Sequence, residues 1–303
     1  MNRMRNFQDV SFNDKVISLQ SDLFINEFLL KLNEQMRALF VESYFKPEES
    51  KIAFIRDFFS HPEVSVVTSQ IINHKISSHR ALDPIYLKKP AGLLDNYFYC
   101  GKAGESIPDR LQAVIHETPR WIRIAGEGQT IINVLIPGSG PGRDIINILA
   151  NNPDLKSKVR AVCVDNEQDA LDLGYELAVK ANVEDCIKFA KGDIMDLDHY
   201  SNFDIVLLIG IICPLGNRTS TAVVSKACSY LRSGGYMLVS AATKKMLVDD
   251  PISAFVMYSI GWKLCYKTDD DIHYILSKSN LKYITSFYDL KNQFHKIAVS
   301  VKL

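Results

Sequence analysis

Residues 131–144 constrain the fold of this chain more than any other segment. They begin as an apolar, β-branched run, which is typical of a buried parallel strand. Glycines then stand at alternate positions, Gly138, Gly140 and Gly142. Glycine lets the backbone approach a ligand closely because it has no Cβ, and the N-terminus of a following helix attracts anionic groups. The segment predicts a strand, a glycine turn and a helix starting at Pro141, with a polar or anionic ligand at the turn.

Further strand patterns follow at the intervals that an alternating α/β fold requires. They cover residues 159–164, 187–190 and 203–210, and a Gly-Gly turn at residues 234–235 precedes another at 236–239. Near the C-terminus, residues 269–279 have helical spacing with acidic residues in the first turn. Two alternating patterns, at residues 281–288 and 295–301, predict a final antiparallel hairpin.

Polar residues directly follow two of these strand patterns. Asp165 follows the second pattern, where a carboxylate suits hydrogen bonding to ribose hydroxyls, and Gly192, Asp193 and Ile194 follow the third. With the G-x-G-x-G turn, this series resembles the class I S-adenosylmethionine-dependent methyltransferases, in which the Gly-Asp-Ile position is the adenine site. The dinucleotide fingerprint G-x-G-x-x-G fits less well, because Arg143 stands where its last glycine belongs.

The resemblance implies an α/β fold: a doubly wound, seven-stranded and mostly parallel sheet with an antiparallel C-terminal hairpin. It covers about residues 128–303 and implies S-adenosylmethionine as the cofactor. The cofactor-binding residues that it implies are Gly138, Ser139, Gly140, Gly142, Arg143, Asp165, Asn166, Asp193, Ile194, Gly210 and Tyr99.

The glycine turn departs from the family pattern in two ways. The residue two before the first glycine is usually acidic and faces the ammonium group of the cofactor, but here it is Ile136. Asp144 and Asp95 are the candidates to replace this acid. Arg143 either pairs with the carboxylate of the cofactor or lies exposed on the helix.

The loop after the fourth strand lies on the acceptor side in this family. It lacks the Asn/Asp-Pro-Pro-Tyr/Phe signature found where exocyclic or amide nitrogens are methylated, and it is mostly apolar, with Ile211, Ile212, Pro214 and Leu215. The resemblance thus implies methyl transfer to a small, partly apolar molecule, with oxygen slightly favoured over nitrogen. No catalytic residue stands out: Cys213 has no partner base in view, and of the seven scattered histidines His116 is the best placed.

Two other functions stay open. Aminopropyl-transferring enzymes, such as spermidine synthases and nicotianamine synthase-like proteins, share the fold and a similar glycine loop, although residues 210–217 lack the carboxylates that would bind an amine. A non-catalytic cofactor-binding module would account for Ile136, although Asp165 and Asp193 argue against it.

Residues 1–127 are predicted to form a separate, mostly helical region. Helical patterns cover residues 21–44, 47–60 and 110–117, the last stopping near Pro119. Within this region, residues 93–104 combine aromatic residues with glycines; related methyltransferases run such a segment over the cofactor, which is why Tyr99 is a candidate. The resemblance implies a cover for the acceptor pocket or a homodimer interface, and a packing cap on the sheet is the alternative.

Composition supports a soluble, cytoplasmic protein and disfavours large nucleic acid substrates. Lysine plus arginine equals aspartate plus glutamate at 35 each, whereas duplex-binding proteins usually carry a basic surface, so nucleic acid is disfavoured as a partner. No signal peptide or membrane-spanning stretch is visible, so no membrane partner is expected. The six cysteines lack the C-x-x-C spacing of zinc sites, and no metal is expected; reduced thiols agree with the cytoplasm.

Overall fold

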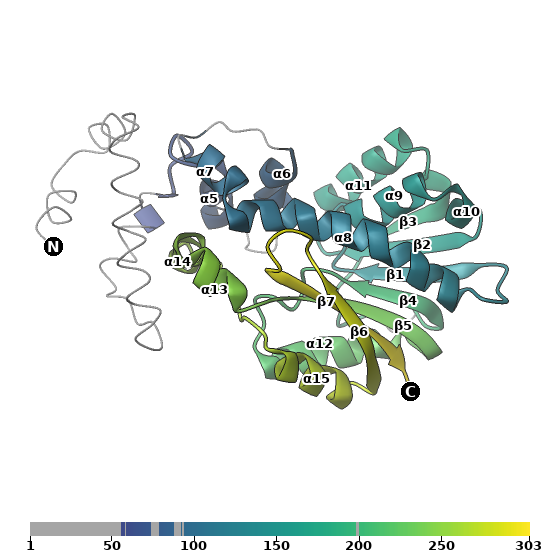
Figure 1. Cartoon of the computed structure of the whole chain (residues 1–303). Coiled ribbons are helices and arrows are strands. Elements are labelled where there is room, and N and C mark those ends of the chain that lie inside the picture. The colour runs from purple at the N-terminus through teal and green to yellow at the C-terminus, as the bar shows by residue number, and fades with distance from the viewer. Residues whose placement is uncertain (1–55, 58, 74–78, 88–91, 93, 198–199) are drawn as a thin grey trace, which may run out of the picture. The chain divides into compact units, whose positions relative to one another are not determined.

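The computed structural model describes most of the chain (Figure 1). The described residues are 56–57, 59–73, 79–87, 92, 94–197 and 200–303. The chain forms two compact units. The first consists of Met1–Ile107 and Lys245–Lys263, and the second of Pro108–Lys244 and Leu264–Leu303. The boundary expected between residues 127 and 128 marks the start of a cofactor-binding region and stays a prediction.

The described part of the first unit is helical. Its helices are α5 (Val66–Asn73), α6 (His79–Leu87), α7 (Asp95–Cys100), α13 (Lys245–Asp249) and α14 (Pro251–Ser259), and α8 (Lys102–Ala125) begins in it. The buried Asp95 carboxylate accepts hydrogen bonds from Ser65 Oγ and from the backbone N–H of Gly92, both at 2.8 Å. The helix predicted over residues 21–44 and most of that over 47–60 lie outside the described residues.

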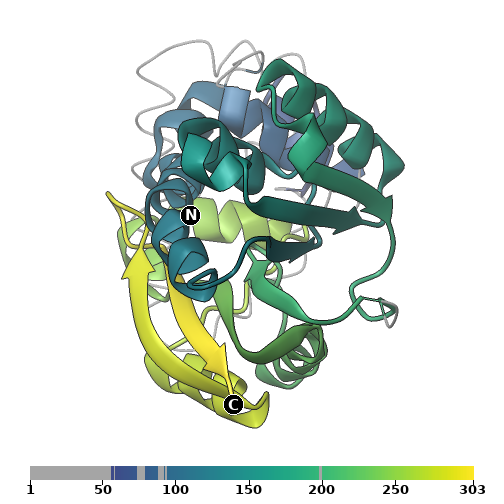
Figure 2. The ribbon, with the colours of Figure 1, turned by 90° about the vertical axis from the view of Figure 1, so that its right-hand side faces the viewer.

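The second unit contains a seven-stranded sheet in the order β3-β2-β1-β4-β5-β7-β6. Its strands are β1 (Ile132–Pro137), β2 (Val159–Asp165), β3 (Ile187–Lys191), β4 (Phe203–Leu208), β5 (Leu231–Ala242), β6 (Leu281–Tyr288) and β7 (His295–Lys302). The first five strands are parallel, and β7 pairs antiparallel with both β5 and β6. Figure 2 shows this antiparallel pair in yellow at one edge of the sheet. The predicted doubly wound sheet with a C-terminal hairpin is confirmed.

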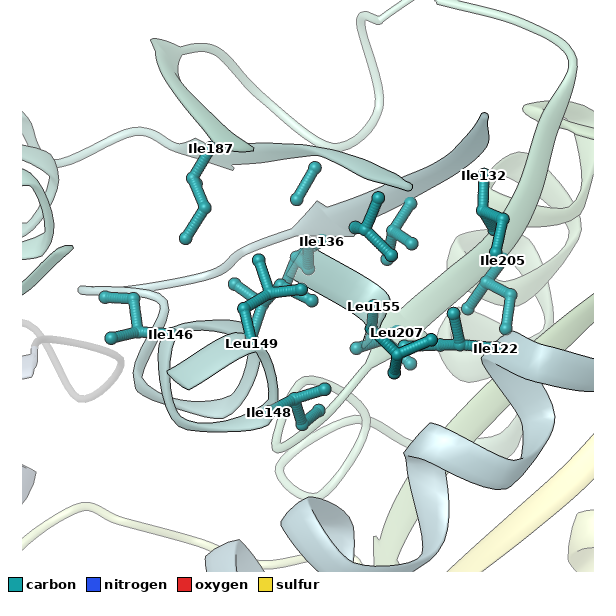
Figure 3. Close-up of a cluster of buried hydrophobic side chains, with 14 of the residues drawn as sticks. Ile122, Ile132, Ile136, Ile146, Ile148, Leu149, Leu155, Ile187, Ile205 and Leu207 are labelled. Atoms are coloured by element: carbon teal, nitrogen blue, oxygen red, sulfur yellow. The ribbon is translucent and has the colours of Figure 1, made fainter. Parts of the chain in front are cut away.

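Helices cover both faces of this sheet, as the alternation of buried side chains on β1 shows. Ile132, Val134 and Ile136 enter a cluster with side chains from α8, α9 (Arg143–Asn151), α10 (Pro153–Lys156) and α11 (Gln168–Lys180), which Figure 3 shows. Leu135 enters a second cluster with side chains from α12 (Asn217–Ser229) and α15 (Asp269–Lys278). The remaining element is a 3-10 turn, Glu184–Cys186. None of the described helices is both long and apolar enough to cross a membrane.

The helix before the first strand is longer than predicted. We expected it to stop near Pro119, but α8 runs from Lys102 to Ala125 and includes Pro108 and Pro119. A proline inside a helix costs about 3 kcal/mol. Beyond Pro119, however, the buried Trp121 and Ile122 pack on the sheet, and burying side chains of this size contributes about 1.5–3 kcal/mol each. Packing therefore outweighs the lost hydrogen bond.

The Gly-Gly pair at 234–235 is not a turn before the fifth strand, because β5 already begins at Leu231 and runs through it. Partners advance two residues on β4, from Phe203 to Ile205, against five on β5, from Leu231 to Tyr236. The pair therefore lies in a bulge of β5, which glycine permits at positive φ or where neighbouring backbone is close.

The bulge brings a charged pair together at the amino ends of the strands. Arg232 Nε donates to the buried Asp204 carboxylate at 2.6 Å, and Nη2 donates to the carbonyl of Ala125 at 3.0 Å. The other oxygen of Asp204 accepts the N–H of Asn133 at 2.8 Å. Asp204 thereby joins β1, β4 and β5, and Arg232 extends the connection to the end of α8.

Gly174 allows α11 to lie close to the glycine turn. A Cβ at this position would lie 2.6 Å from Phe189 Cε1 and 2.7 Å from the carbonyl oxygen of Pro141. Glycine inside a helix costs about 1 kcal/mol relative to alanine, so this residue is explained by the close approach rather than by helix formation.

We expect Gly174→Ala to lower the free energy of unfolding by about 1–3 kcal/mol, because the added methyl group displaces the turn or Phe189. Denaturant unfolding measures the change. The control is Tyr175→Ala, the exposed neighbour on the same helix, which should stay within about 0.5 kcal/mol of the wild type. A Gly174→Ala variant as stable as the wild type would contradict the close packing.

Candidate functional site

The glycine turn leaves the carboxyl end of β1 with three residues in the left-handed region. The φ angles are 67° at Gly138, 51° at Gly140 and 68° at Gly142. Because Gly142 is the N-cap of α9, the helix begins at Arg143, two residues after the expected start at Pro141. A Cβ at Gly138 would overlap Ile211 Cδ1, and one at Gly142 would lie 2.9 Å from Cys163 Sγ. The turn is thus a tightly packed cradle of bare backbone.

Asp165, the last residue of β2, holds this turn in place. Its Oδ2 accepts the N–H of Gly140 at 2.7 Å, and its Oδ1 accepts the N–H of Glu167 at 3.0 Å. A carboxylate offers about four acceptor sites, so each oxygen keeps one site for a ligand. The N–H of Ser139 donates to the carbonyl of Val164 at 3.0 Å, which joins the turn to the same strand end.

The Gly-Asp-Ile segment lies at the carboxyl end of the neighbouring strand β3. The N–H of Gly192 donates to the carbonyl of Asp165 at 2.9 Å, so the two strand ends are in direct contact. Asp193 is exposed, and its Oδ1 accepts the N–H of Met195 at 2.8 Å. Ile194 is half-buried against the second hydrophobic cluster. The apolar side chain and the carboxylate are therefore at one edge of the sheet with Asp165.

Gly210 follows β4 on the other side of β1. Its φ is 81°, and its N–H donates to Ser240 Oγ of β5 at 2.7 Å. A Cβ on Gly210 would lie 3.3 Å from Nη1 and 3.5 Å from Nη2 of Arg110, a residue of α8 that is only 8% exposed. This buried guanidinium was not identified from the sequence, where Arg110 is only the first residue of a helical pattern. No local signal marks it, because its position depends on how α8 packs on the sheet.

The other predicted site residues differ from one another in burial and in hydrogen bonding. Ser139 Oγ donates to the carbonyl of Gly140 at 2.9 Å, Arg143 is half-buried and Asn166 is exposed. Tyr99 belongs to the first unit, where its side chain is buried; burial, with a smaller contribution from the charge of Asp95, raises its pKa to about 12. Ten of the eleven predicted residues thus belong to the second unit, and their binding roles stay predictions.

The loop after β4 is anchored by the segment before α15. The N–H of Cys265 donates to the carbonyl of Cys213 at 2.7 Å, and the buried Lys267 ammonium donates to the carbonyls of Leu215 and Cys265. Burial raises the pKa of the Cys213 thiol, which keeps it protonated and a poor nucleophile. Ile212 is buried in the second cluster, so Ile211, Pro214 and Leu215 are the apolar residues left to contact an acceptor.

Comparison with known proteins agrees with this fold. A family model described as a methyltransferase domain matches residues 131–287. No curated protein matches the chain. Magnesium protoporphyrin IX methyltransferase from Synechocystis PCC 6803, solved with S-adenosylhomocysteine bound, has a TM-score of 0.54 at 13% identity, covering 83% of this chain and 99% of that one. The same enzyme has also been solved with S-adenosylmethionine bound.

Other solved structures share the fold. A Bordetella parapertussis protein described as a possible exported protein has a TM-score of 0.62 at 12% identity, covering 97% of this chain and 98% of that one. An O-methyltransferase family protein from Burkholderia thailandensis has a TM-score of 0.53 at 13% identity, covering 79% and 64%. The chain spans only 60% and 59% of the length of two further solved chains that it resembles.

A second cluster of ionisable groups lies where β7 begins. The backbone N–H of His295 donates to Asp289, and His295 Nδ1 lies 3.8 Å from Asp289 Oδ1, too far for a hydrogen bond. This nitrogen is buried without a hydrogen-bond partner among the described residues. Burial, with a smaller effect from the positive charge of Arg110, holds the pKa of His295 well below its usual value. His116, which we named as the best-placed histidine, has a side chain that is 79% exposed beside Glu117.

We expect the free energy of unfolding to fall as the pH drops below about 6.5, because the unfolded chain protonates His295 where the folded chain does not. For one proton the slope reaches at most about 1.4 kcal/mol per pH unit. His295→Gln should remove most of this slope between about pH 6.5 and 5. Denaturant unfolding at several pH values measures it.

The matched control is His116→Gln, which makes the same change on an exposed side chain and should keep the slope of the wild type. The charged groups around His295 are Asp289 and Arg110, and both stay in place in the two variants. An unchanged slope in His295→Gln would show that burial does not suppress protonation of this imidazole.

Proposed function

Because the chain belongs to the class I S-adenosylmethionine-dependent methyltransferases, we propose that it transfers a methyl group from S-adenosylmethionine to a small, partly apolar molecule, with oxygen favoured as the nucleophile. One observation carries the cofactor half of this proposal. The left-handed glycine turn and the Asp165 carboxylate are held together by the hydrogen bond from Gly140 to Asp165, and both retain groups for a ligand.

The residues at the carboxyl ends of β1, β2 and β3 match the parts of this cofactor. The bare backbone at Gly138–Gly142 accommodates a close approach, since side chains there would clash or be strained. The two free acceptor sites of Asp165 suit the two ribose hydroxyls, and Asp193 with Ile194 suits the amine and ring of adenine. We assign these residues to the ribose and the adenine, respectively.

S-adenosylmethionine carries its own electrophile, a methyl group on a positively charged sulfur. The residues of this chain therefore have to hold the cofactor, align the acceptor and keep water out. The loop Ile211–Gly216 suits the second task, because it is anchored by Lys267 and Cys265 and its remaining contact residues are apolar. The loop lacks the Asn/Asp-Pro-Pro-Tyr/Phe signature found where exocyclic or amide nitrogens are methylated, which supports a hydroxyl acceptor.

We expect the protein to bind S-adenosylmethionine and S-adenosylhomocysteine with micromolar dissociation constants, and decarboxylated S-adenosylmethionine and NAD at least about tenfold more weakly. Calorimetric titration with the four ligands measures this. Preference for the decarboxylated form would replace methyl transfer with aminopropyl transfer. Binding of the first two without turnover of any acceptor would support the non-catalytic module, and binding of none would contradict the cofactor assignment.

Two variants test where the cofactor binds in the same titration. Asp165→Ala should weaken binding by about tenfold to a hundredfold, since each charge-assisted hydrogen bond is worth about 1.5–3 kcal/mol. Asp172→Asn, an exposed carboxylate on α11 bonded to Gln168, should leave the affinity unchanged. Thermal unfolding of both variants shows whether the turn stays folded. Unchanged affinity in Asp165→Ala would remove the ribose assignment.

We expect a hydroxyl acceptor to be methylated at least about tenfold faster than the amine with the same ring. The pair 1-naphthol and 1-naphthylamine has a common apolar ring and differs only in the nucleophilic atom. Formation of S-adenosylhomocysteine measures the rate for each, with a charged acceptor of similar size as the control for apolar contact. A faster amine would reverse the preference for oxygen, and a faster charged acceptor would contradict the apolar acceptor site.

A further inference from the structure

The amino-acid end of the proposed cofactor has both a carboxylate and an ammonium group. The carboxyl end of β1 has no charged side chain that could pair with either group. Ile136, which stands at the usually acidic position, is only 3% exposed and packs in the hydrophobic cluster beneath α9. Leaving a charge of the ligand without a partner in a partly buried site is costly. If this site binds S-adenosylmethionine, other charged residues near the turn have to receive these two groups.

Arg110 provides a buried positive charge at the required edge of the sheet. Its guanidinium lies against Gly210, which follows β4, and both terminal nitrogens are within 3.5 Å of the position that a Cβ would occupy there. The left-handed φ of Gly210 and the absence of a side chain leave the space in which the guanidinium lies. Arginine is suited to this task, because its planar fork binds a carboxylate through two parallel hydrogen bonds.

Asp144 provides the opposite charge. It stands in the first turn of α9, two residues after the left-handed N-cap Gly142, and is half-buried. Burial raises the pKa of Asp144, and the nearby charge of Arg110 lowers it. Burial, with a smaller contribution from the negative charge of Asp144, raises the pKa of Cys163, the β2 residue that lies under Gly142. Asp144 is therefore near enough to both the base of the glycine turn and Arg110 to affect or sense their charges.

The topology of the sheet makes this position the expected place for a ligand. The neighbours of β1 are β2 on one side and β4 on the other, so the order of connections reverses at this strand. In open α/β sheets, ligands bind outside the carboxyl ends of the strands at such a reversal. The glycine turn and Asp144 follow β1, and Gly210, against which Arg110 lies, follows β4, so both residues are at the carboxyl ends of the two strands that flank this reversal.

We propose that Arg110 and Asp144 together hold the amino-acid end of the cofactor, Arg110 binding its carboxylate and Asp144 its ammonium group. The assignment rests on the proposed function. It replaces the acid missing at Ile136 with Asp144, eight residues further along the chain in the first turn of α9, and it gives the carboxylate to Arg110 rather than to Arg143. Before the cofactor binds, the positive charge of Arg110 favours the ionised form of Asp144.

Three ligands separate the two roles. S-adenosylhomocysteine has both charged groups, decarboxylated S-adenosylmethionine has only the ammonium group at this end, and 5′-methylthioadenosine has neither. Arg110→Met should weaken S-adenosylhomocysteine by about tenfold to a hundredfold and leave the other two within about threefold. Asp144→Asn should weaken the first two ligands and leave 5′-methylthioadenosine within about threefold. Calorimetry measures the affinities, so no acceptor is needed.

The control is Arg120→Met, the same change at an exposed arginine of the same helix, which should alter none of the three affinities. If Arg110→Met does not fold, Arg110→Lys keeps the charge without the fork and should weaken S-adenosylhomocysteine alone, by less than the methionine variant. Equal losses for all three ligands would make Arg110 a structural residue and overturn the proposal, as would a selective loss in Arg143→Met instead. A wild type that binds S-adenosylhomocysteine and 5′-methylthioadenosine equally would also overturn it, whereas a wild type that binds neither would contradict the proposed function.

Discussion

The hydrogen bond from Gly140 N–H to the Asp165 carboxylate joins the ends of β1 and β2, and the geometry of the site depends on it. Three residues with left-handed backbone in a span of five have little conformational preference of their own, because glycine is flexible. The turn is ordered from outside: by Asp165 at its middle, by Cys163 beneath Gly142, and by α11, which approaches Pro141 where Gly174 has no side chain. One carboxylate thus shapes the turn while keeping acceptor sites for a ligand.

Two Asp–Arg combinations of the second unit lie at opposite ends of the parallel strands and have different consequences. Asp204 and Arg232, at the amino ends, hydrogen-bond to each other and to backbone groups of two further elements, β1 and α8. That combination is closed and stabilises the sheet. Arg110 and Asp144, at the carboxyl ends, come from α8 and α9, and the Arg110 guanidinium lies against the bare backbone of Gly210. The same pair of residue types therefore stabilises the sheet at one end of the strands and, under our proposal, binds a ligand at the other.

Most of the sheet could be predicted from the sequence, because local patterns determine it. The alternation of Ile132, Val134 and Ile136 with Leu135 reflects two covered faces, and the patterns at 281–288 and 295–301 are the observed hairpin strands. Predictions failed where packing opposes a local preference. Pro119 stays in α8 because Trp121 and Ile122 after it are buried, and the glycines at 234–235 lie in a bulge within β5 instead of a turn before it.

The same distinction between local patterns and packing applies to the site. Its glycines and the acids at strand ends could be predicted, because their positions follow from the strand boundaries. Arg110 could not, since a helical arginine is ordinarily solvated and only the docking of α8 buries this one at 8% exposure. Burial raises the pKa of Asp144 and Cys213 and lowers that of His295, and in all three groups the positive charge of Arg110 adds a smaller effect that lowers the pKa. A buried cation favours negative charge near it, so under our proposal a ligand with a carboxylate gains an interaction at this edge of the sheet that a ligand without one does not.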